Sequence, residues 1–409
     1  MATRRDVLRW AGATGGAVLL GGCARGAGTA PQPPASTDLL YVATGAGLAV
    51  LRADRKGPVV EAVPAIATTD WRHVVSAVTV GAGTKVTVRG VSGERVVTEY
   101  VVPGRLAART ATAGGTLIAL ATASTGETGR GGEAPYRPAG RDRTTISVLD
   151  AGGERHRFDL AGCLEPDAFD ASGGRLFVLE YLPPANPDSY RVRMLDLATG
   201  KIGPLAPFPK ALPPQDEDIM WGEGRQAVYD ERRQILFTLY TRQRPQAHAF
   251  VHALNLTVGW AYCVDLPEPF GQGPAAGHTI ARAPGSGSLY AFDATSGRIA
   301  VIDPDGLSVV QTRTVAPSSG AAASVTTPDG QALFLGAGTA LTRLDTAGLA
   351  VTDQWRVAAP VRGIAAGPDG GRCYVGQPDA VLALDPRTGA VLDRIAAPGL
   401  VILRHAIQG

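Results

Sequence analysis

The chain has 409 residues, of which 45% are hydrophobic and 19% are charged, and it contains 52 glycines and 30 prolines. So much Gly and Pro predicts many turns and few long amphipathic helices. The formal net charge is +2, and it falls to zero without the first 22 residues, which hold three arginines and one aspartate. A chain without excess positive charge lacks the electrostatic footprint of a nucleic-acid-binding protein, so we expect no nucleic-acid partner.

The first 22 residues have the features of an export signal and are set aside from the fold. Arg4 and Arg5, followed by an apolar step and a further arginine, resemble a twin-arginine signal. An uncharged run from residue 10 to residue 20 follows, and it is too short to cross a bilayer, which takes about 20 apolar residues. We therefore expect residues 1–22 to be a signal peptide of the twin-arginine type, with the general secretory route as the open alternative.

The uncharged run ends in Leu20-Gly21-Gly22-Cys23, which resembles a lipobox. The resemblance implies cleavage before Cys23 and acylation of its thiol with chains such as palmitate. Buried acyl chains would hold the mature protein at the extracytoplasmic side of the cell membrane. Residues 23–38 are then a lipidated tether, because residues 24–37 carry three prolines and no large apolar side chain. The alternative is a plain secretory signal with an unrelated cysteine.

From residue 39 onward, a unit of about 40–50 residues recurs. Its centre is a short apolar strand that ends in Asp and is followed by a Gly-containing turn, as in residues 147–152 and 193–200. The Asp can accept bonds from turn amides, and Gly supplies the positive φ that closes the turn. Another apolar run precedes each such strand. The order predicts four-stranded antiparallel sheets, the blades of a β-propeller.

The units indicate eight blades over residues 39–409. The first unit opens with what should be its second strand, and a strand at 400–403 is left over after the eighth. We therefore expect the C-terminal strand to complete the first blade and close the ring. A ring of seven is the alternative, in which the weakly marked unit at 66–103 is not a blade.

Two short motifs add a family resemblance. Tyr41-Val42-Ala43-Thr44 and Tyr374-Val375-Gly376, the latter after a Pro-Asp-Gly turn, resemble the repeats of YVTN-type, YncE-like propellers. The resemblance implies the quinoprotein amine dehydrogenase-like fold only. The tryptophans with which related repeats dock pyrroloquinoline quinone are replaced here by Pro204 and Asp393. We expect no cofactor.

The connections between strands are unequal in length, and the long ones should lie together. Residues 124–143, 182–188, 207–225 and 267–277 all join second to third strands, or one blade to the next, in consecutive units. In an up-and-down blade these connections lie on one face of the disc. Function resides in loops more often than in scaffold, so one sector of that face is the candidate binding surface. Its candidate residues are Asp216, Trp221, Arg225, His248 and His278.

The mature chain has three cysteines, at 163, 263 and 373. A disulfide between Cys163 and Cys263 is one possibility, because an oxidising compartment permits it, and three free thiols are the other. Cys373 falls in a second strand and is expected in the core.

No residue pattern predicts a resident metal or a catalytic site. His248 and His252 lie four residues apart in one strand, about 13 Å, which is too far to chelate one ion. His248 and His278 could converge, and a metal site there is a minor alternative. No nucleophile elbow, zinc-protease helix or phosphate loop occurs in the sequence. We expect a non-catalytic module that binds a cell-envelope protein or a small ligand. The alternative is an extracytoplasmic hydrolase or lactonase that uses the mouth of the central channel.

Overall fold

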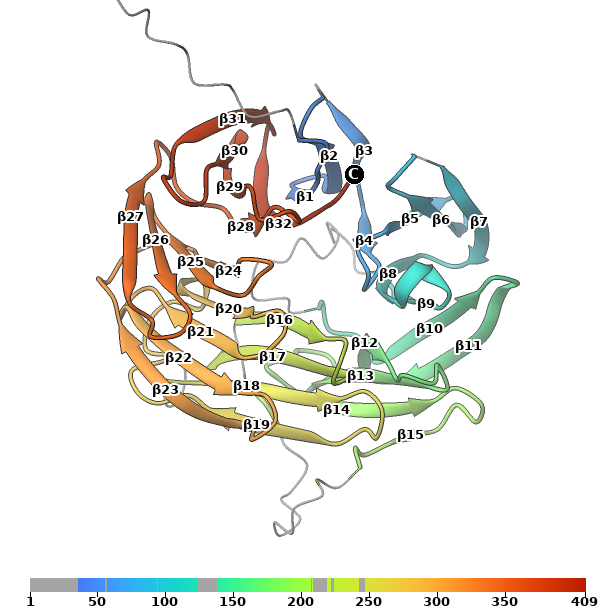
Figure 1. Ribbon diagram of the computed structural model, residues 1–409. Coiled ribbons are helices and arrows are strands. Elements are labelled where there is room, and N and C mark those ends of the chain that lie inside the picture. The colour runs from blue at the N-terminus through green and yellow to red at the C-terminus, as the bar shows by residue number, and fades with distance from the viewer. Residues whose placement is uncertain are drawn as a thin grey trace, which may run out of the picture. The chain divides into compact units, whose positions relative to one another are not determined.

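The computed structural model describes residues 36–409 except 56, 94, 124–137, 207, 209–218, 222–223 and 243–246, with backbone alone for residues 224, 225 and 242. Regular structure within the described residues is β-strand, apart from two single turns of 3₁₀-helix, η1 (Ala113–Gly115) and η2 (Ala275–Gly277). The strands form eight sheets of four strands each. The eight sheets are arranged in a ring, and this part of the chain is therefore an eight-bladed β-propeller (Figure 1).

Each blade is numbered along the ring, and its strands are given from the first, innermost strand to the fourth, outermost strand. Blade 1 consists of β32 (Leu400–Ile407), β1 (Leu39–Thr44), β2 (Gly47–Arg52) and β3 (Pro58–Val63). Blade 2 consists of β4 (Ala65–Ala67), β5 (His73–Val80), β6 (Gly83–Gly90) and β7 (Val96–Pro103). Blade 3 consists of β8 (Leu106–Ala111), β9 (Ile118–Thr122), β10 (Arg143–Asp150) and β11 (Gly153–Ala161). Blade 4 consists of β12 (Cys163–Phe169), β13 (Arg175–Leu182), β14 (Ser189–Asp196) and β15 (Ile202–Gly203).

The second half of the ring repeats the same order. Blade 5 consists of β16 (Gly224–Asp230), β17 (Ile235–Arg242), β18 (His248–Asn255) and β19 (Ala261–Asp265). Blade 6 consists of β20 (His278–Arg282), β21 (Leu289–Asp293), β22 (Arg298–Asp303) and β23 (Ser308–Thr314). Blade 7 consists of β24 (Ala322–Thr326), β25 (Ala332–Ala337), β26 (Ala340–Asp345) and β27 (Val351–Arg356). Blade 8 consists of β28 (Ile364–Ala366), β29 (Cys373–Gln377), β30 (Ala380–Leu384) and β31 (Val391–Ala396).

The second and third strands read as continuous apolar runs because each blade is buried on both faces. Successive side chains of a strand point to opposite faces of its sheet. In β29, Cys373 and Val375 pack toward blade 7, whereas Tyr374 packs toward blade 1. All three side chains are buried, and Cys373 is in the core as the sequence predicts. A strand between two neighbours therefore needs an apolar residue at every position.

The described residues form eight apolar clusters, and each cluster fills one of the eight interfaces between neighbouring blades. The interface of blade 8 with blade 1 has such a cluster, and it includes Leu400, Leu403 and Ala406 of the C-terminal strand. Because every blade is held by two clusters, no blade is the terminal unit of an open stack.

The closure that the sequence predicts is confirmed. β32 pairs antiparallel with β1, from Leu39 opposite Ile407 to Thr44 opposite Leu400. The Tyr374 hydroxyl also donates to Asp38 Oδ2 at 2.7 Å, which ties the start of the described chain to blade 8. The weakly marked unit forms blade 2, so the ring has eight blades and the seven-blade alternative is wrong.

The strand order divides the connections between two faces of the disc. The turn face carries the connections of first to second and third to fourth strands. The loop face carries the connections of second to third strands and the links from one blade to the next.

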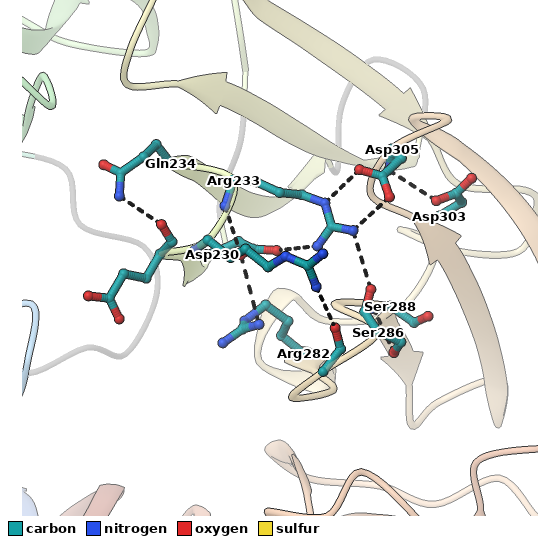
Figure 2. A network of polar contacts seen from close by, with 11 residues as sticks. Asp230, Arg233, Gln234, Arg282, Ser286, Ser288, Asp303 and Asp305 are labelled. Carbon is teal, nitrogen blue, oxygen red and sulfur yellow. Dashed lines mark hydrogen bonds and ion pairs between the residues drawn. The ribbon is translucent and has the colours of Figure 1, made fainter.

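On the turn face, charged side chains join neighbouring blades. Arg233 of blade 5 donates through Nη1 to buried Asp230 at 2.9 Å and through Nη2 to Asp305 of blade 6 at 2.6 Å (Figure 2). Arg232 donates to the Gly285 carbonyl of blade 6. The buried carboxylate of Asp230 is thereby compensated, as a charge removed from water must be.

Candidate functional site

The four connections singled out in the sequence lie on the loop face of blades 3 to 6, as their places in the strand order predict. They are the β9–β10 and β13–β14 loops and the links β15–β16 and β19–β20. We call their described parts the loop-face sector, and they comprise residues 138–142, 183–188, 204–206, 208, 219–221 and 266–277. Among the residues proposed from sequence, Arg4, Arg5, Cys23 and Asp216 lie outside the described residues. Arg225 is described by its backbone alone, opposite Tyr240 in the β16–β17 ladder.

Trp221 is exposed on a segment that is fixed by backbone hydrogen bonds. The Met220 N–H donates to the Tyr190 carbonyl at 2.7 Å, and the Tyr190 N–H donates to the Met220 carbonyl at 2.9 Å. Met220 itself is buried. Its neighbours Ile219 and Trp221 are each 41% exposed, although both are large and apolar. The link between blades 4 and 5 thus presents two apolar side chains to solvent at a defined position.

A row of aromatic rings lies beneath this segment. Ring centroids are 5.6 Å apart from Tyr181 to Tyr190, 5.4 Å from Tyr190 to Tyr240 and 5.4 Å from Tyr240 to Phe250. Met220 packs in the same cluster. Rings at such separations interact favourably beyond the area that they bury. The row gives the exposed pair a rigid base that crosses the interface of blades 4 and 5.

The two histidines proposed for this face have different environments. The His248 side chain is 39% exposed, and its Nε2 lies 3.0 Å from Asp265 Oδ1 on the neighbouring strand β19. His278 is buried at the start of β20. Its Nε2 accepts a hydrogen bond from the Gly271 N–H at 3.0 Å, and its Nδ1 lies 3.0 Å from the Pro274 carbonyl.

The His278 ring therefore makes hydrogen bonds through both nitrogens to the β19–β20 link that precedes it. Because Nε2 accepts from Gly271, Nδ1 carries the proton and donates to Pro274 in the neutral ring. Burial lowers the pKa of this imidazole, against the opposing charge of Asp293, whose Oδ1 lies 3.8 Å from Nε2. Both ring nitrogens are thus engaged within the link. No group of three or more metal-ligating side chains occurs in the described residues.

A buried charge cluster in the inner strands was missed by the sequence reasoning. Arg109 of β8 and Glu165 of β12 form an ion pair with Nε and Oε2 2.5 Å apart, and both side chains are fully buried. Arg141, next to the β9–β10 loop, lies 2.5 Å from the other oxygen of Glu165 and also donates to the Leu164 carbonyl and to Thr144. One carboxylate therefore lies between two guanidiniums in the wall of the ring.

The only sequence signal for this cluster is the presence of charged residues inside first strands. Arg109 falls between alanine and threonine, and Glu165 falls between leucine and proline. The cluster also shows that part of the enlarged β9–β10 connection belongs to the scaffold. The Arg141 N–H donates to the Pro184 carbonyl at 2.8 Å, so residues 138–142 are held against the β13–β14 loop.

No disulfide joins Cys163 to Cys263 in the described structure, and Cys373 forms none either. Cys163 begins the innermost strand of blade 4, whereas Cys263 lies in the outermost strand of blade 5. Strands in a sheet are about 4.8 Å apart, so three strand spacings put these radial positions beyond disulfide range. Burial raises the pKa of the Cys163 thiol and raises that of Cys373 to about 12, so both thiols stay protonated and unreactive.

Within the part of the chain that the structure describes, no helix has the length and apolarity to cross a bilayer. No family model matches the sequence, and no curated protein matches it significantly. Solved structures do resemble the fold. Apo AztD from Citrobacter koseri superimposes with a TM-score of 0.55 at 12% identity, over 90% of this chain and 97% of that one.

Two further solved structures are similar to the same extent. The dihydro-heme d1 dehydrogenase NirN, in complex with DHE, has a TM-score of 0.53 at 14% identity and covers 93% of this chain and 77% of its own. Sqt1 of Saccharomyces cerevisiae has a TM-score of 0.52 at 11% identity and covers 90% of both chains. At such low identity the likeness defines the class of fold, a β-propeller, and nothing of its chemistry.

Proposed function

We propose that this protein is a lipid-anchored, extracytoplasmic β-propeller that binds a cell-envelope protein or a small ligand through the loop-face sector and catalyses no reaction. The observation that carries the proposal is the exposed pair Ile219 and Trp221 on a segment fixed to β14. Exposed tryptophan on a rigid base is the kind of residue that dominates binding energy at interfaces. A partner that covers it gains apolar burial without ordering a flexible loop.

The path of the chain is compatible with a lipid anchor at Cys23. Residues 36–38 reach the propeller on the turn face, where Asp38 accepts from the Tyr374 hydroxyl and from the Ala53 N–H. Twelve residues separate Cys23 from Ser36. Even fully extended they span only about 40 Å. A lipid on Cys23 would therefore keep the point at which the chain enters the propeller within about 40 Å of the membrane.

The hydrolase alternative needs a carboxylate that can take up a proton at the channel mouth. The inner strands of blades 3 and 4 contain two carboxylates, and that of Glu165 is held on both oxygens by guanidiniums, while Asp167 is half-buried in β12. Glu165 is thus a poor proton acceptor, and the exposed pair Ile219 and Trp221 favours the binding role.

The test is affinity capture from native membranes in mild detergent, followed by mass spectrometry of co-purified proteins and small molecules. We expect a stoichiometric companion with the wild type, and much less of it with Trp221→Ala. Val258→Ala is the matched control, because Val258 is 54% exposed on the turn face of the neighbouring blade. Equal capture by both variants would place the binding surface elsewhere.

The anchor is tested separately. In cells, Cys23→Ala should leave the precursor uncleaved and unlipidated, because the acyl acceptor is absent. Replacing Arg4 and Arg5 with lysines should stop export if the twin-arginine route is used. A native protein that enters the aqueous phase in a detergent phase separation would contradict the lipid anchor.

A further inference from the structure

The turn face has a cleft between blades 7 and 8 that the loop-face proposal does not involve. Its volume is about 460 Å³, within the range of small-molecule sites. Its walls are the first-to-second turns of both blades, residue 343 of β26, and the third-to-fourth turn of blade 8. Three prolines line it, at positions 328, 368 and 386.

Four charged side chains line the same cleft, two of each sign: Asp329, Asp369, Arg343 and Arg387. Three of them directly follow the lining prolines in the sequence. Proline fixes the backbone φ angle of its own residue, so the charges are carried on stiff turns. Opposite charges in one cleft would ordinarily pair with each other. Here no ion pair within 4.0 Å joins any two of the four.

The carboxylates are held by their own turns. Asp329 Oδ1 accepts from the Gln331 N–H at 3.0 Å and from the Thr327 hydroxyl at 2.6 Å. Asp369 Oδ1 accepts from the Gly371 N–H at 2.8 Å. The Thr327 hydrogen bond lowers the pKa of Asp329, so that carboxylate stays ionised at neutral pH. Each carboxylate is bonded through one oxygen, which leaves its second oxygen for another donor.

The guanidiniums have donors to spare. Arg343 binds Thr352 and Asp353 through Nη1 alone, at 2.9 and 3.2 Å, and its buried Nε has no hydrogen-bond partner among the described residues. The Arg387 backbone N–H donates to Asp385, but its side chain makes no hydrogen bond or ion pair within the described chain. Guanidinium binds carboxylate and phosphate oxygens in a fork of parallel hydrogen bonds.

We propose that this cleft binds a small zwitterion, with an oxyanion group against Arg343 and Arg387 and an ammonium group against Asp329 and Asp369. A simple anion would lie against two carboxylates as well as the guanidiniums, and a simple cation would lie against two guanidiniums as well as the carboxylates, so each would meet like charge in the cleft. A zwitterion can place each of its charges against the opposite one, and the proline walls receive its short carbon chain. Two sources carry this chemistry: an ethanolamine phospholipid headgroup and a free amino acid.

The experiment is calorimetric titration of the full-length protein in non-ionic detergent with four probes. O-phosphoethanolamine and glycine are the zwitterions, and inorganic phosphate and ethanolamine each carry one of the two charges. We expect saturable binding of one zwitterion per protein, about tenfold or more tighter than either single-charge probe. Tighter binding of O-phosphoethanolamine would assign the site to a lipid headgroup, and tighter binding of glycine would assign it to an amino acid.

Two variants test the assignment to this cleft. Arg387→Gln removes the positive charge of the unpaired side chain, and Asp369→Asn removes a negative charge but keeps a carbonyl for the Gly371 N–H. Each should weaken the zwitterion about tenfold or more at unchanged melting temperature. Arg313→Gln and Asp379→Asn, both at exposed positions outside the cleft, should bind like the wild type. The proposal is overturned if neither zwitterion saturates, or if the cleft variants bind as the controls do. Neither result bears on Trp221, since the loop-face proposal has its own test.

Discussion

The turn face and the loop face are made by the same eight blades, yet their connections obey different rules. Turn-face connections are short and are held by side chains within the turn. Asp150, Asp345 and Asp385 each accept a backbone N–H two or three residues ahead. The loop-face sector is instead held by contacts between connections that are distant in sequence, such as Met220 with Tyr190 and Arg141 with Pro184.

This difference determines how freely the connections on each face can change in length. A turn that satisfies its own backbone groups costs little to repeat, so the turn face can recur with small variation around the ring. A connection that depends on distant partners can change length without disturbing the blades, because loop closure costs only about 0.6 kcal/mol for each doubling of length. The loop face is therefore where a propeller can acquire an enlarged binding surface, whereas the cleft between blades 7 and 8 is built from turns of ordinary length. Five experiments test that contrast, taken from the largest expected effect to the smallest.

Deletion of residues 400–409 should have the largest effect. Blade 1 would lose its inner strand, and with it Leu400, Leu403 and Ala406 of the cluster that joins blades 8 and 1. Loss of β32 uncovers the edge of β1 and opens the ring, so we expect aggregation or a loss of most of the roughly 5–15 kcal/mol that stabilises a typical domain. Soluble yield measures the aggregation, and thermal melting measures the loss of stability. Removal of residues 408–409 alone is the control, and equal melting of the two truncations would contradict C-terminal closure.

Glu165→Gln should come next, because it leaves two guanidiniums without their shared carboxylate. Loss of one partner from a buried ion pair costs about 3–5 kcal/mol. The control is Asp159→Asn, which breaks the exposed pair with Arg143 in blade 3 and should cost less than about 1 kcal/mol. Chemical denaturation of both variants measures the two losses in free energy of unfolding. Similar losses would mean that the buried cluster has no special role in the wall.

Acidification should destabilise the propeller through two histidines, His278 and His405, whose pKa values are lowered in the folded chain. Burial lowers the pKa of His405 in β32 to about 4 and also lowers that of His278. The unfolded chain takes up these protons near its ordinary pKa of about 6.5, before the folded chain does. The contribution of both residues is therefore fully present above that value and is lost as the pH falls toward 4. His405→Gln should flatten the dependence of melting temperature on pH between 7 and 4. His156→Gln, in the outermost strand β11, is the substitution control.

Shortening the β9–β10 loop should cost little, provided that Arg141 is kept. Replacement of residues 125–136 by a short Gly-Ser turn should change the free energy of unfolding by about 1 kcal/mol or less. Extending the replacement through residue 143 should cost several kcal/mol more, because it removes one of the two arginines on Glu165. Paired denaturation curves test this boundary. If both replacements proved equally mild, residues 138–142 would be loop rather than scaffold.

Trp221→Ala should have a small effect on stability and a large effect on binding. A 41% exposed side chain still buries more than half of its surface, so melting should shift by an amount equivalent to about 1 kcal/mol. Binding of the partner captured from membranes should weaken by about 2 kcal/mol or more if Trp221 is a hot spot. Met220→Ala is the comparison variant. It removes a buried side chain, so it should lower stability more than Trp221→Ala does.

The sequence alone was sufficient for the architecture because the signal is local and repeated. An apolar run, an Asp and a Gly turn specify each third strand and its turn, and repetition makes the pattern readable even where single units are weak. Blade 2 lacks the Asp, yet its strands still form a four-stranded sheet between blades 1 and 3. The leftover strand at 400–403 likewise predicted ring closure, because an unpaired strand must find an edge.

Only the tertiary structure decided which polar residues meet. Arg109 and Glu165 are 56 positions apart in sequence, and only the adjacency of two inner strands makes them a buried pair. The cleft between blades 7 and 8 gathers Asp329 and Arg387 in the same way. His248 and His278 read alike in the sequence, but one side chain is partly exposed beside Asp265 and the other is buried within its own link. A propeller brings together residues about one repeat apart, and hydrophobic periodicity sets where strands lie without recording which polar side chains their neighbours carry.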